Sequence, residues 1–176
     1  EIWNKLDTKL QVVAGRSCGK HPFWSPKPMH DDIASTNINC WTNGFWPGLM
    51  WLMYIGTGNE VYKKTAEVGE MQLDRALAIP EKISHDVGFI WMLAARPDWE
   101  ITKNHKSWQR LKVAASYLMG RFNPEGGYVR AWDWGKDNME KVGWTIIDTM
   151  MNIPQLYWMS RWCNDTGISQ RKVKEI

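Results

Sequence analysis

The sequence has few cysteines and lacks the common nucleotide and nucleophile motifs. Its three cysteines, Cys18, Cys40 and Cys163, show no paired spacing, and such a set is typical of free thiols rather than of a disulfide framework or a zinc site. The four histidines lack the spacing of metal ligands. A Gly-x-Ser-x-Gly elbow and a glycine-rich phosphate loop are also missing. We therefore predict no metal site and no cofactor.

Long apolar runs and a strong charge of one sign are missing as well. No run is long enough to span a bilayer. The net charge of +3 comes with scattered Lys and Arg residues, which argues against a nucleic-acid-binding face. We therefore predict neither a membrane nor a nucleic acid as partner. No signal peptide is visible, but the chain begins at Glu1 rather than methionine, so a cytoplasmic and a periplasmic location both stay open.

What the chain does have is enough apolar material for one sizeable core. Hydrophobic residues make up 44% and charged residues 23% of its 176 residues, which is typical of a globular protein. Tryptophan occurs 13 times. Its ring is a good surface for stacking on sugars, but it is also ordinary core material.

Three apolar segments share one layout and predict a repeat of helices. Residues 46–55, 87–95 and 153–162 are apolar on nearly every side, as expected of helices that are buried all round. Turn-forming residues follow these segments at 56–59, 96–98 and 164–167. Proline near the first and third starts suits the first turn of a helix. We expect Asn43 and Asn152, just ahead of those prolines, to act as caps.

Amphipathic segments follow the first two apolar helices. Residues 59–78 and 104–121 carry apolar stripes at helical period. An inner apolar helix, a short turn and an outer amphipathic helix form the unit of an α/α toroid or solenoid. Residues 123–132 contain a glycine pair and a short β-prone run, which predicts a loop or small hairpin. A third outer helix is expected from about residue 169, so we expect the chain to be the N-terminal part of a longer protein.

Two aspartates lie at the edges of the apolar segments. Asp86 stands in SHDVGF and Asp148 in GWTIIDTMMN, where a lone buried carboxylate would be costly. Inner-helix starts converge on one mouth of a toroid, so we expect the two carboxylates, 148 − 86 = 62 residues apart, to face one cavity. Burial or a second nearby carboxylate supplies the raised pKa that a proton donor needs, which suggests acid/base chemistry on a sugar. The simpler alternative is that both are ordinary first-turn aspartates.

Four short motifs stand in a consistent order along the chain. They are WTNGFWPG at 41–48, HDVGF at 85–89, GYVRAW at 127–132 and GWTIIDTMMN at 143–152. In sequence and order they resemble the signatures of the unsaturated glucuronyl hydrolases, glycoside hydrolase family 88. The resemblance covers roughly residues 40–167, whereas the first 39 residues match loosely.

The resemblance implies an all-α fold, the (α/α)6 barrel of six helical hairpins, of which this chain supplies about three. Residues 1–176 are then an incomplete single catalytic domain, the N-terminal half of the barrel. Family members take their uronate-binding groups largely from the other half. Half a toroid also exposes apolar inner-helix surface, so we expect these residues alone to be unstable or inactive.

The resemblance also implies a reaction and a role for each motif residue. Polysaccharide lyases leave a C4=C5 double bond on the terminal uronic acid of an oligosaccharide, and this family removes that sugar by hydrating the vinyl ether. Asp148 is then the general acid that protonates C4 and the base that activates the water. Asp86 is the second catalytic carboxylate, and His85 contacts the substrate. The aromatic residues implied to line the sugar subsites are Trp41, Phe45 and Trp132.

Two other functions are compatible with the same sequence. An unsaturated rhamnogalacturonyl hydrolase shares the barrel and the chemistry but acts on pectin fragments, although the motifs at 41–48 and 85–89 fit the glucuronyl family better. A non-catalytic helical-repeat protein that binds glycans would share the architecture alone, since a fold does not dictate an activity. In that case Asp86→Asn and Asp148→Asn would leave the function intact.

Overall fold

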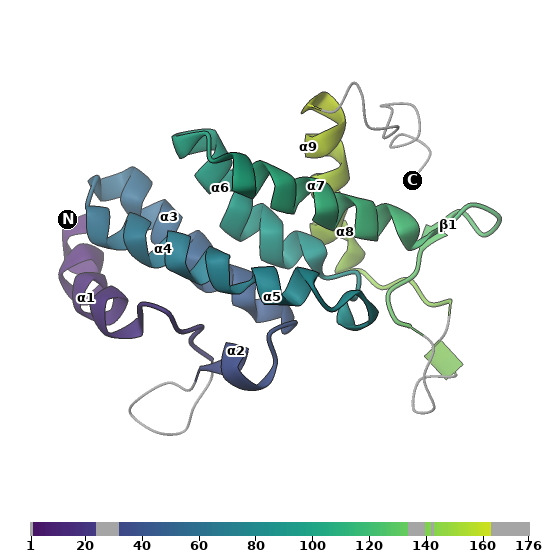
Figure 1. The fold of residues 1–176 in the computed structure, drawn as a ribbon, viewed down its shortest axis with the longest axis horizontal. Coiled ribbons are helices and arrows are strands. Elements are labelled where there is room, and N and C mark those ends of the chain that lie inside the picture. Colours follow the sequence, from purple (N-terminus) through teal and green to yellow (C-terminus); the bar gives the residue numbers. More distant parts are fainter. Residues whose placement is uncertain (1, 24–31, 134–139, 142, 163–176) are drawn as a thin grey trace.

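The computed structural model describes residues 2–23, 32–133, 140–141 and 143–162. Helical hairpins follow one another along the chain, from the blue pair α3 and α4 through the teal and green pair α6 and α7 to the yellow α9 (Figure 1). Contacts join α3 to α4, α3 to α6, α6 to α7 and α7 to α9. The predicted all-α architecture is therefore confirmed.

The first hairpin consists of α3 (Phe45–Thr57) and α4 (Glu60–Gln72). Helix α3 ends at Gly58, which adopts a left-handed φ of 71°, a conformation that glycine reaches without the penalty of a Cβ. Asn59 then caps α4, because its side-chain oxygen accepts a hydrogen bond from the backbone N–H of Val61 at 3.1 Å. The predicted inner helix, its turn and the start of the outer helix are confirmed. The outer helix breaks at Leu73 and resumes as the short α5 (Asp74–Leu77).

The second hairpin begins with a π-helical turn, η3 (Gly88–Met92), which continues into α6 (Leu93–Thr102) and is followed by α7 (His105–Gly120). The predicted turn at 96–98 is wrong, since Pro97 lies inside α6. The chain reverses at Lys103, with a φ of 60°.

A buried carboxylate accounts for the displaced turn. Asp98 accepts hydrogen bonds from Thr102, Asn104 and Ser107, and these bonds hold the end of α6 against the start of α7. Tertiary contacts therefore outweigh the local turn preference of Arg-Pro-Asp.

The third hairpin is described as far as its inner helix. Helix α8 (Thr149–Asn152) leads into α9 (Pro154–Trp162), which confirms the helix expected at 153–162. Its expected turn at 164–167 and the outer helix from 169 lie outside the described residues, as does Cys163, whereas Cys18 and Cys40 are free thiols. The small hairpin expected at 123–132 is confirmed as β1 (Phe122–Asn123) paired antiparallel with β2 (Tyr128–Val129).

The remaining elements extend and connect the hairpins. Helix α1 (Ile2–Ser17) packs on α3 and α4, and Tyr62 of α4 donates a hydrogen bond to the carboxylate of Asp7 at 2.6 Å. Two short elements, α2 (Ile33–Thr36) and η1 (Trp41–Gly44), precede the first hairpin, and η2 (Pro80–Lys82) lies between the first and the second. Among the described residues, every helix is too short or too polar to be a candidate membrane span.

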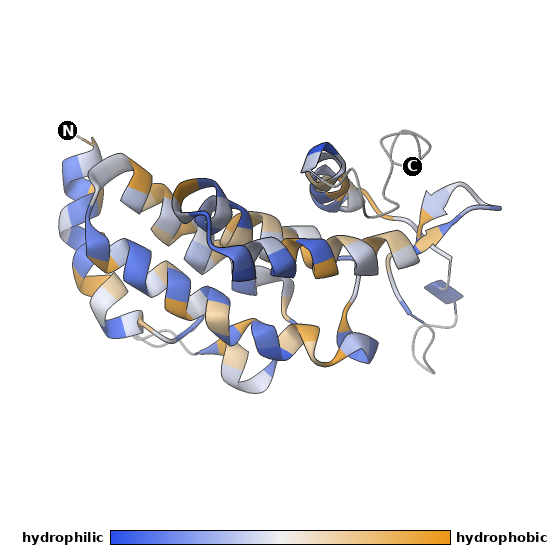
Figure 2. Cartoon of the chain, turned by 45° about the horizontal axis from the view of Figure 1, so that its top comes forward, coloured by the Kyte–Doolittle hydropathy of each residue, from blue (hydrophilic) through white to orange (hydrophobic). Residues whose placement is uncertain are grey.

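Two groups of buried side chains form the core. One lies between α1, α3 and α4 and includes Met50, Trp51 and Tyr62. The larger one joins η3, α6, α7 and α9 and includes Trp91 and Leu111. Hydrophilic and hydrophobic positions alternate along the outer helices (Figure 2), as their amphipathic sequences predict.

Glycines bring the starts of the inner helices together. A Cβ on Gly44 would collide with the backbone of Phe89 and Ile90, and a Cβ on Gly88 would collide with the backbone of Asn152. Gly44 has an ordinary φ of −75°, so the reason for glycine there is space and not backbone conformation. The first inner start therefore touches the second, and the second touches the third.

The expectation that Asn43 and Asn152 cap the inner helices is wrong. Asn43 lies within η1, and its buried amide donates hydrogen bonds to the carbonyls of Asn37 and Ile38. Asn152 is the last residue of α8, and its amide bonds to groups of two different segments. Asn43 therefore bonds to the loop just before η1, and Asn152 bonds to its own segment and to Phe89, 63 residues away, rather than capping the helix that follows.

Candidate active site

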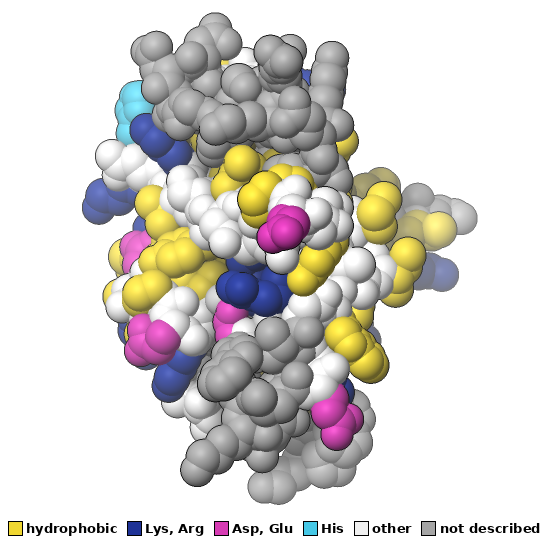
Figure 3. Space-filling view, turned by 90° about the vertical axis from the view of Figure 1, so that its right-hand side faces the viewer, with side chains coloured by type: hydrophobic (Ala, Val, Ile, Leu, Met, Phe, Trp, Pro, Cys, Tyr) yellow, Lys and Arg dark blue, Asp and Glu magenta, His cyan; other side chains and the backbone are white. Residues whose placement is uncertain are grey.

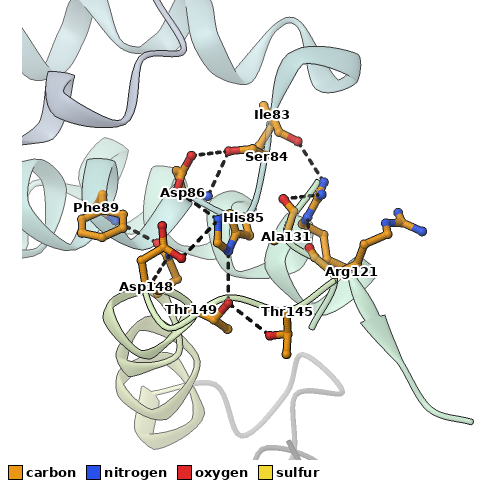
Figure 4. Close-up of polar contacts among 12 residues, drawn as sticks. Ile83, Ser84, His85, Asp86, Phe89, Arg121, Ala131, Thr145, Asp148 and Thr149 are labelled. Atoms are coloured by element: carbon orange, nitrogen blue, oxygen red, sulfur yellow. Dashed lines mark hydrogen bonds and ion pairs between the residues drawn. The ribbon is translucent and has the colours of Figure 1, made fainter. Parts of the chain in front are cut away.

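The two aspartates are brought together through a histidine, as Figure 4 shows. Asp86 lies just before η3, and Asp148 lies just before α8. The Nε2 atom of His85 is 3.3 Å from a carboxylate oxygen of Asp86 and 3.8 Å from one of Asp148. Carboxylates from two successive hairpins thus face one imidazole ring.

His85 is buried, and its second nitrogen also has a partner. Its Nδ1 atom is 3.2 Å from the hydroxyl oxygen of Thr149, which in turn lies 3.4 Å from the hydroxyl oxygen of Thr145. Burial lowers the pKa of His85 from its ordinary value, although Asp86 and Asp148 act in the opposite direction. The neutral form of the ring is therefore favoured at pH 7, and in this form only one of its two nitrogens carries a proton.

Asp86 is held by the residue that precedes the histidine. The hydroxyl of Ser84 donates a hydrogen bond of 2.6 Å to one carboxylate oxygen of Asp86, and the same hydroxyl accepts one from the backbone N–H of Asp86 at 3.1 Å. The other carboxylate oxygen faces His85. Both oxygens therefore have fixed neighbours, which suits a group that stays in place during a reaction.

Asp148 has more freedom than Asp86. Its side chain is 39% exposed, and its buried oxygen Oδ1 has no hydrogen-bond partner among the described residues. The backbone carbonyl of Asp148 accepts a hydrogen bond from the amide of Asn152 at 3.2 Å. The residue is thus anchored by its backbone, while its carboxyl group is available to a ligand.

The imidazole nitrogen and the carboxylate oxygens of this site are also atom types that bind metal cations. One ligand atom from each of His85, Asp86 and Asp148 lies within 4.8 Å of the others. The same spacing suits proton transfer, in which two carboxylates share a reacting centre.

Exposed aromatic rings lie beside the Asp86 segment. Trp41 and Phe45, which are about half exposed, pack within 5.4–6.0 Å of the ring of Phe89 and of one another. With Pro22 they contribute to the wall of a cavity of about 430 Å³. Two of the three predicted stacking residues are therefore brought together next to the HDVGF motif.

Trp132, the third predicted stacking residue, lies on a different segment. Its ring contacts that of Trp144 at 6.2 Å, on the segment that leads to Asp148, and Lys141 lies over it at 5.6 Å. Trp132 therefore lies beside the GWTIIDTMMN motif, whereas Trp41 and Phe45 lie beside the HDVGF motif.

Arg121 is a structural organiser that the sequence did not reveal. It is buried, and its guanidinium donates hydrogen bonds to the carbonyls of Ile83, Arg130 and Ala131 and to the carboxylate of Asp133. It therefore ties the segment before His85 to the segment that carries Trp132. On the face in Figure 3, basic side chains in dark blue lie in a hollow beside apolar ones.

Ser84, Thr149 and Asn152 were also missed as site residues. A signal existed for the last two, since both stand inside the GWTIIDTMMN motif. Their partners, however, lie 63 or 64 residues away in the chain, and such contacts leave no periodic trace in a sequence.

The fold and the site together place the protein in the class of the α/α toroids, with a pair of carboxylates where two inner helices begin. No family model matches the sequence. The unsaturated chondroitin disaccharide hydrolase of Streptococcus pyogenes is 30% identical over 168 residues, which are 94% of this chain and 41% of that protein. The unsaturated glucuronyl hydrolase of Bacillus sp. strain GL1 is 34% identical over 126 residues, 71% of this chain and 33% of that protein.

Solved structures of unsaturated glucuronyl hydrolases are also similar to this chain. The crystal structure of the Bacillus sp. GL1 enzyme, described as responsible for glycosaminoglycan degradation, superposes with a TM-score of 0.77 at 28% identity and covers 98% of this chain. An unsaturated glucuronyl hydrolase variant solved with dGlcA-Glc-Rha-Glc gives a TM-score of 0.80 at 26% identity, again over 98% of this chain.

The chain is therefore a homologue of the unsaturated glucuronyl hydrolases, and the resemblance to glycoside hydrolase family 88 is confirmed. It spans 46% of the length of those two solved chains. The hairpins described above correspond to part of their (α/α)6 barrel.

Proposed function

We propose that the protein is a glycoside hydrolase that removes the unsaturated, 4-deoxy uronic acid from the non-reducing end of oligosaccharides made by polysaccharide lyases. The observation that carries this proposal is the meeting of His85 and Asp86 with Asp148 from the next hairpin. Homology to hydrolases of unsaturated glucuronyl and chondroitin disaccharides supports the choice of a glycosaminoglycan-type substrate.

The reaction is the hydration of a vinyl ether. Asp148, in its acid form, gives its proton to C4 of the sugar, and positive charge develops at C5 and the ring oxygen. The carboxylate so formed takes a proton from a water molecule, whose oxygen adds to C5. The resulting hemiketal opens and releases the partner sugar. The side chain of Asp148 is 39% exposed, which suits a carboxyl group that must reach both a sugar carbon and a water molecule.

Asp86 and His85 support Asp148 through their charge and their position. A fixed carboxylate at Asp86 stabilises the cationic transition state. Ser84 holds this carboxylate in place. His85 lies between the two acids and is proposed to contact the substrate. The rings of Trp41, Phe45 and Trp132 are proposed to stack on the sugar units.

The test uses the ultraviolet absorbance of the conjugated double bond. Full-length protein is mixed with unsaturated disaccharides from chondroitin, hyaluronan and heparin, and with an unsaturated pectin disaccharide as the comparison. We expect the absorbance to fall with at least one glycosaminoglycan disaccharide and to persist with the pectin disaccharide. Loss with the pectin disaccharide alone would identify a rhamnogalacturonyl hydrolase, and no loss with any of them would refute the proposal.

A further inference from the structure

Asn152 is a fully buried amide at the junction between the second and third hairpins. Its exposed fraction is 0%, and an amide in such a place needs hydrogen-bond partners to offset the loss of water. It finds them on two different segments. Its oxygen accepts a hydrogen bond from the backbone N–H of Phe89 at 3.1 Å, and its nitrogen donates one to the backbone carbonyl of Asp148 at 3.2 Å.

The bond to Phe89 replaces a helix cap. The first N–H groups of a helix have no partner within the helix, and Val87, at the capping position of η3, makes no side-chain cap. Asn152 supplies that cap from the neighbouring hairpin. The same amide fixes the carbonyl of Asp148, four residues earlier in its own segment.

Backbone packing brings the two segments into range. A Cβ on Gly88 would collide with the backbone of Asn152 and approach its side-chain oxygen at 2.7 Å. The close approach at Gly88 and the two amide bonds therefore determine one spacing, that between the segment with His85 and Asp86 and the segment with Asp148.

We propose that Asn152 is a positioning residue that sets the separation of the two catalytic carboxylates. This inference rests on the proposed function, since it concerns the same site. Asn152 would not touch the substrate, because both polar groups of its amide are bonded to backbone. It acts by holding the backbone of Asp148 against the start of η3, so that both carboxylates reach the same imidazole. Misplacement of a reacting group by about 1 Å can lower a rate roughly a hundredfold.

The test compares Asn152→Ala with a matched control in the full-length protein. Gln155 is also a buried amide with an exposed fraction of 0%, and it lies three residues further on. Its nitrogen donates a hydrogen bond to the carbonyl of Leu111 on α7, away from the carboxylates. Gln155→Ala therefore removes an equally buried amide without touching the site.

We expect the two variants to lose similar thermal stability but to differ in turnover. Asn152→Ala should lower kcat about tenfold or more, with KM changed by less than about threefold because the proposed stacking residues remain in place. Gln155→Ala should keep kcat within about twofold of the wild type. If Asn152→Ala does not fold, Asn152→Ser, which retains a polar group but cannot reach both partners, should show the same split between kcat and KM.

A second measurement is independent of activity. Hydrogen exchange of the Phe89 amide should be faster in Asn152→Ala and unchanged in Gln155→Ala. Unchanged kcat in Asn152→Ala, an equal loss of kcat in Gln155→Ala, or a Phe89 amide that remains protected in Asn152→Ala would each overturn the inference. A wild-type protein inactive on every disaccharide would refute the proposed function, while the exchange measurement would still decide whether Asn152 ties the two segments.

Discussion

At the scale of single residues, the site depends on where one proton sits on His85. A neutral imidazole carries one N–H, and Nε2 faces two carboxylates, which are acceptors when ionised. The proton is therefore best placed on Nε2. Nδ1 then accepts a hydrogen bond from the hydroxyl of Thr149, so the carboxylates favour this tautomer and Thr149 supplies the donor that the second nitrogen needs.

The role of Thr149 can be tested with an isosteric pair. Thr149→Val keeps the volume but leaves Nδ1 buried without a donor, and we expect kcat/KM to fall about tenfold as the ring loses the hydrogen bond that orients it. Thr149→Ser keeps the hydroxyl and should stay within about threefold of the wild type. Equal activity of the valine and serine variants in the absorbance assay would contradict this role.

Asp148 should matter to the reaction far more than to stability. Asp148→Asn removes the proton donor, and we expect kcat to fall at least about a hundredfold. The melting temperature should stay within about 2 °C, because the buried oxygen Oδ1 has no hydrogen bond among the described residues to lose and lies only at the long distance of 3.8 Å from His85. Glu125→Asn, in the exposed turn between β1 and β2, is the control and should leave both values unchanged. A variant at position 148 with undiminished turnover would favour a non-catalytic protein.

At the scale of elements, the contacts between inner-helix starts depend on missing side chains. Gly44→Ala would force a Cβ into the backbone of Phe89 and Ile90, and overpacking of this kind typically costs about 1–3 kcal/mol. Gly120→Ala, at the end of α7, meets no atom within 4 Å and should stabilise the protein by roughly 0.5 kcal/mol. Urea unfolding of the two variants measures both effects, and equal stabilities would show that the contact at Gly44 is loose.

The helices themselves could be predicted from the sequence because periodicity is a local signal. The apolar segments at 46–55 and 153–162 and the stripe at 104–121 correspond to α3, α9 and α7. The hairpin at 123–132 followed from its glycine pair. The convergence of the segments with Asp86 and Asp148 followed from the repeat, and the spacing found at His85 agrees with it.

The errors occur where side-chain hydrogen bonds, near or distant in sequence, decide the local structure. Pro97 stays inside a helix whose end is held by the hydrogen bonds of Asp98. Asn152 caps a segment 63 residues away instead of its own helix. Arg121 gathers carbonyls from two loops. A single sequence shows the residue types in each case but not the partner.

At the scale of the whole molecule, a buried charge network joins the two outer helices. Arg110 of α7 forms two hydrogen bonds with Asp74, at 2.6 and 2.7 Å, and a third with Glu70 of α4 at 2.9 Å. Asp74 is half exposed, whereas Glu70 is fully buried. Burial therefore raises the pKa of Glu70 to about 8.

This raised pKa gives stability a definite dependence on pH. Between pH 4.5, the ordinary value, and about 8, folded Glu70 retains a proton that the unfolded chain has released. Unfolding then releases protons, so stability should fall as the pH rises through this range. Glu70→Gln should flatten that part of the curve in urea unfolding at several pH values. Glu60→Gln, on an exposed site of the same helix, should retain the slope of the wild type.

The close contacts at Gly44 and Gly88 also bear on how the protein folds. Each hairpin is made of neighbours in sequence, whereas these contacts join residues about 45 and 64 positions apart, and long-range contacts form late and slowly. Helices can therefore be complete while the carboxylates are still apart. The meeting of the two carboxylates is therefore a property of the last step of assembly, so a partly folded chain would have its helices without the assembled site.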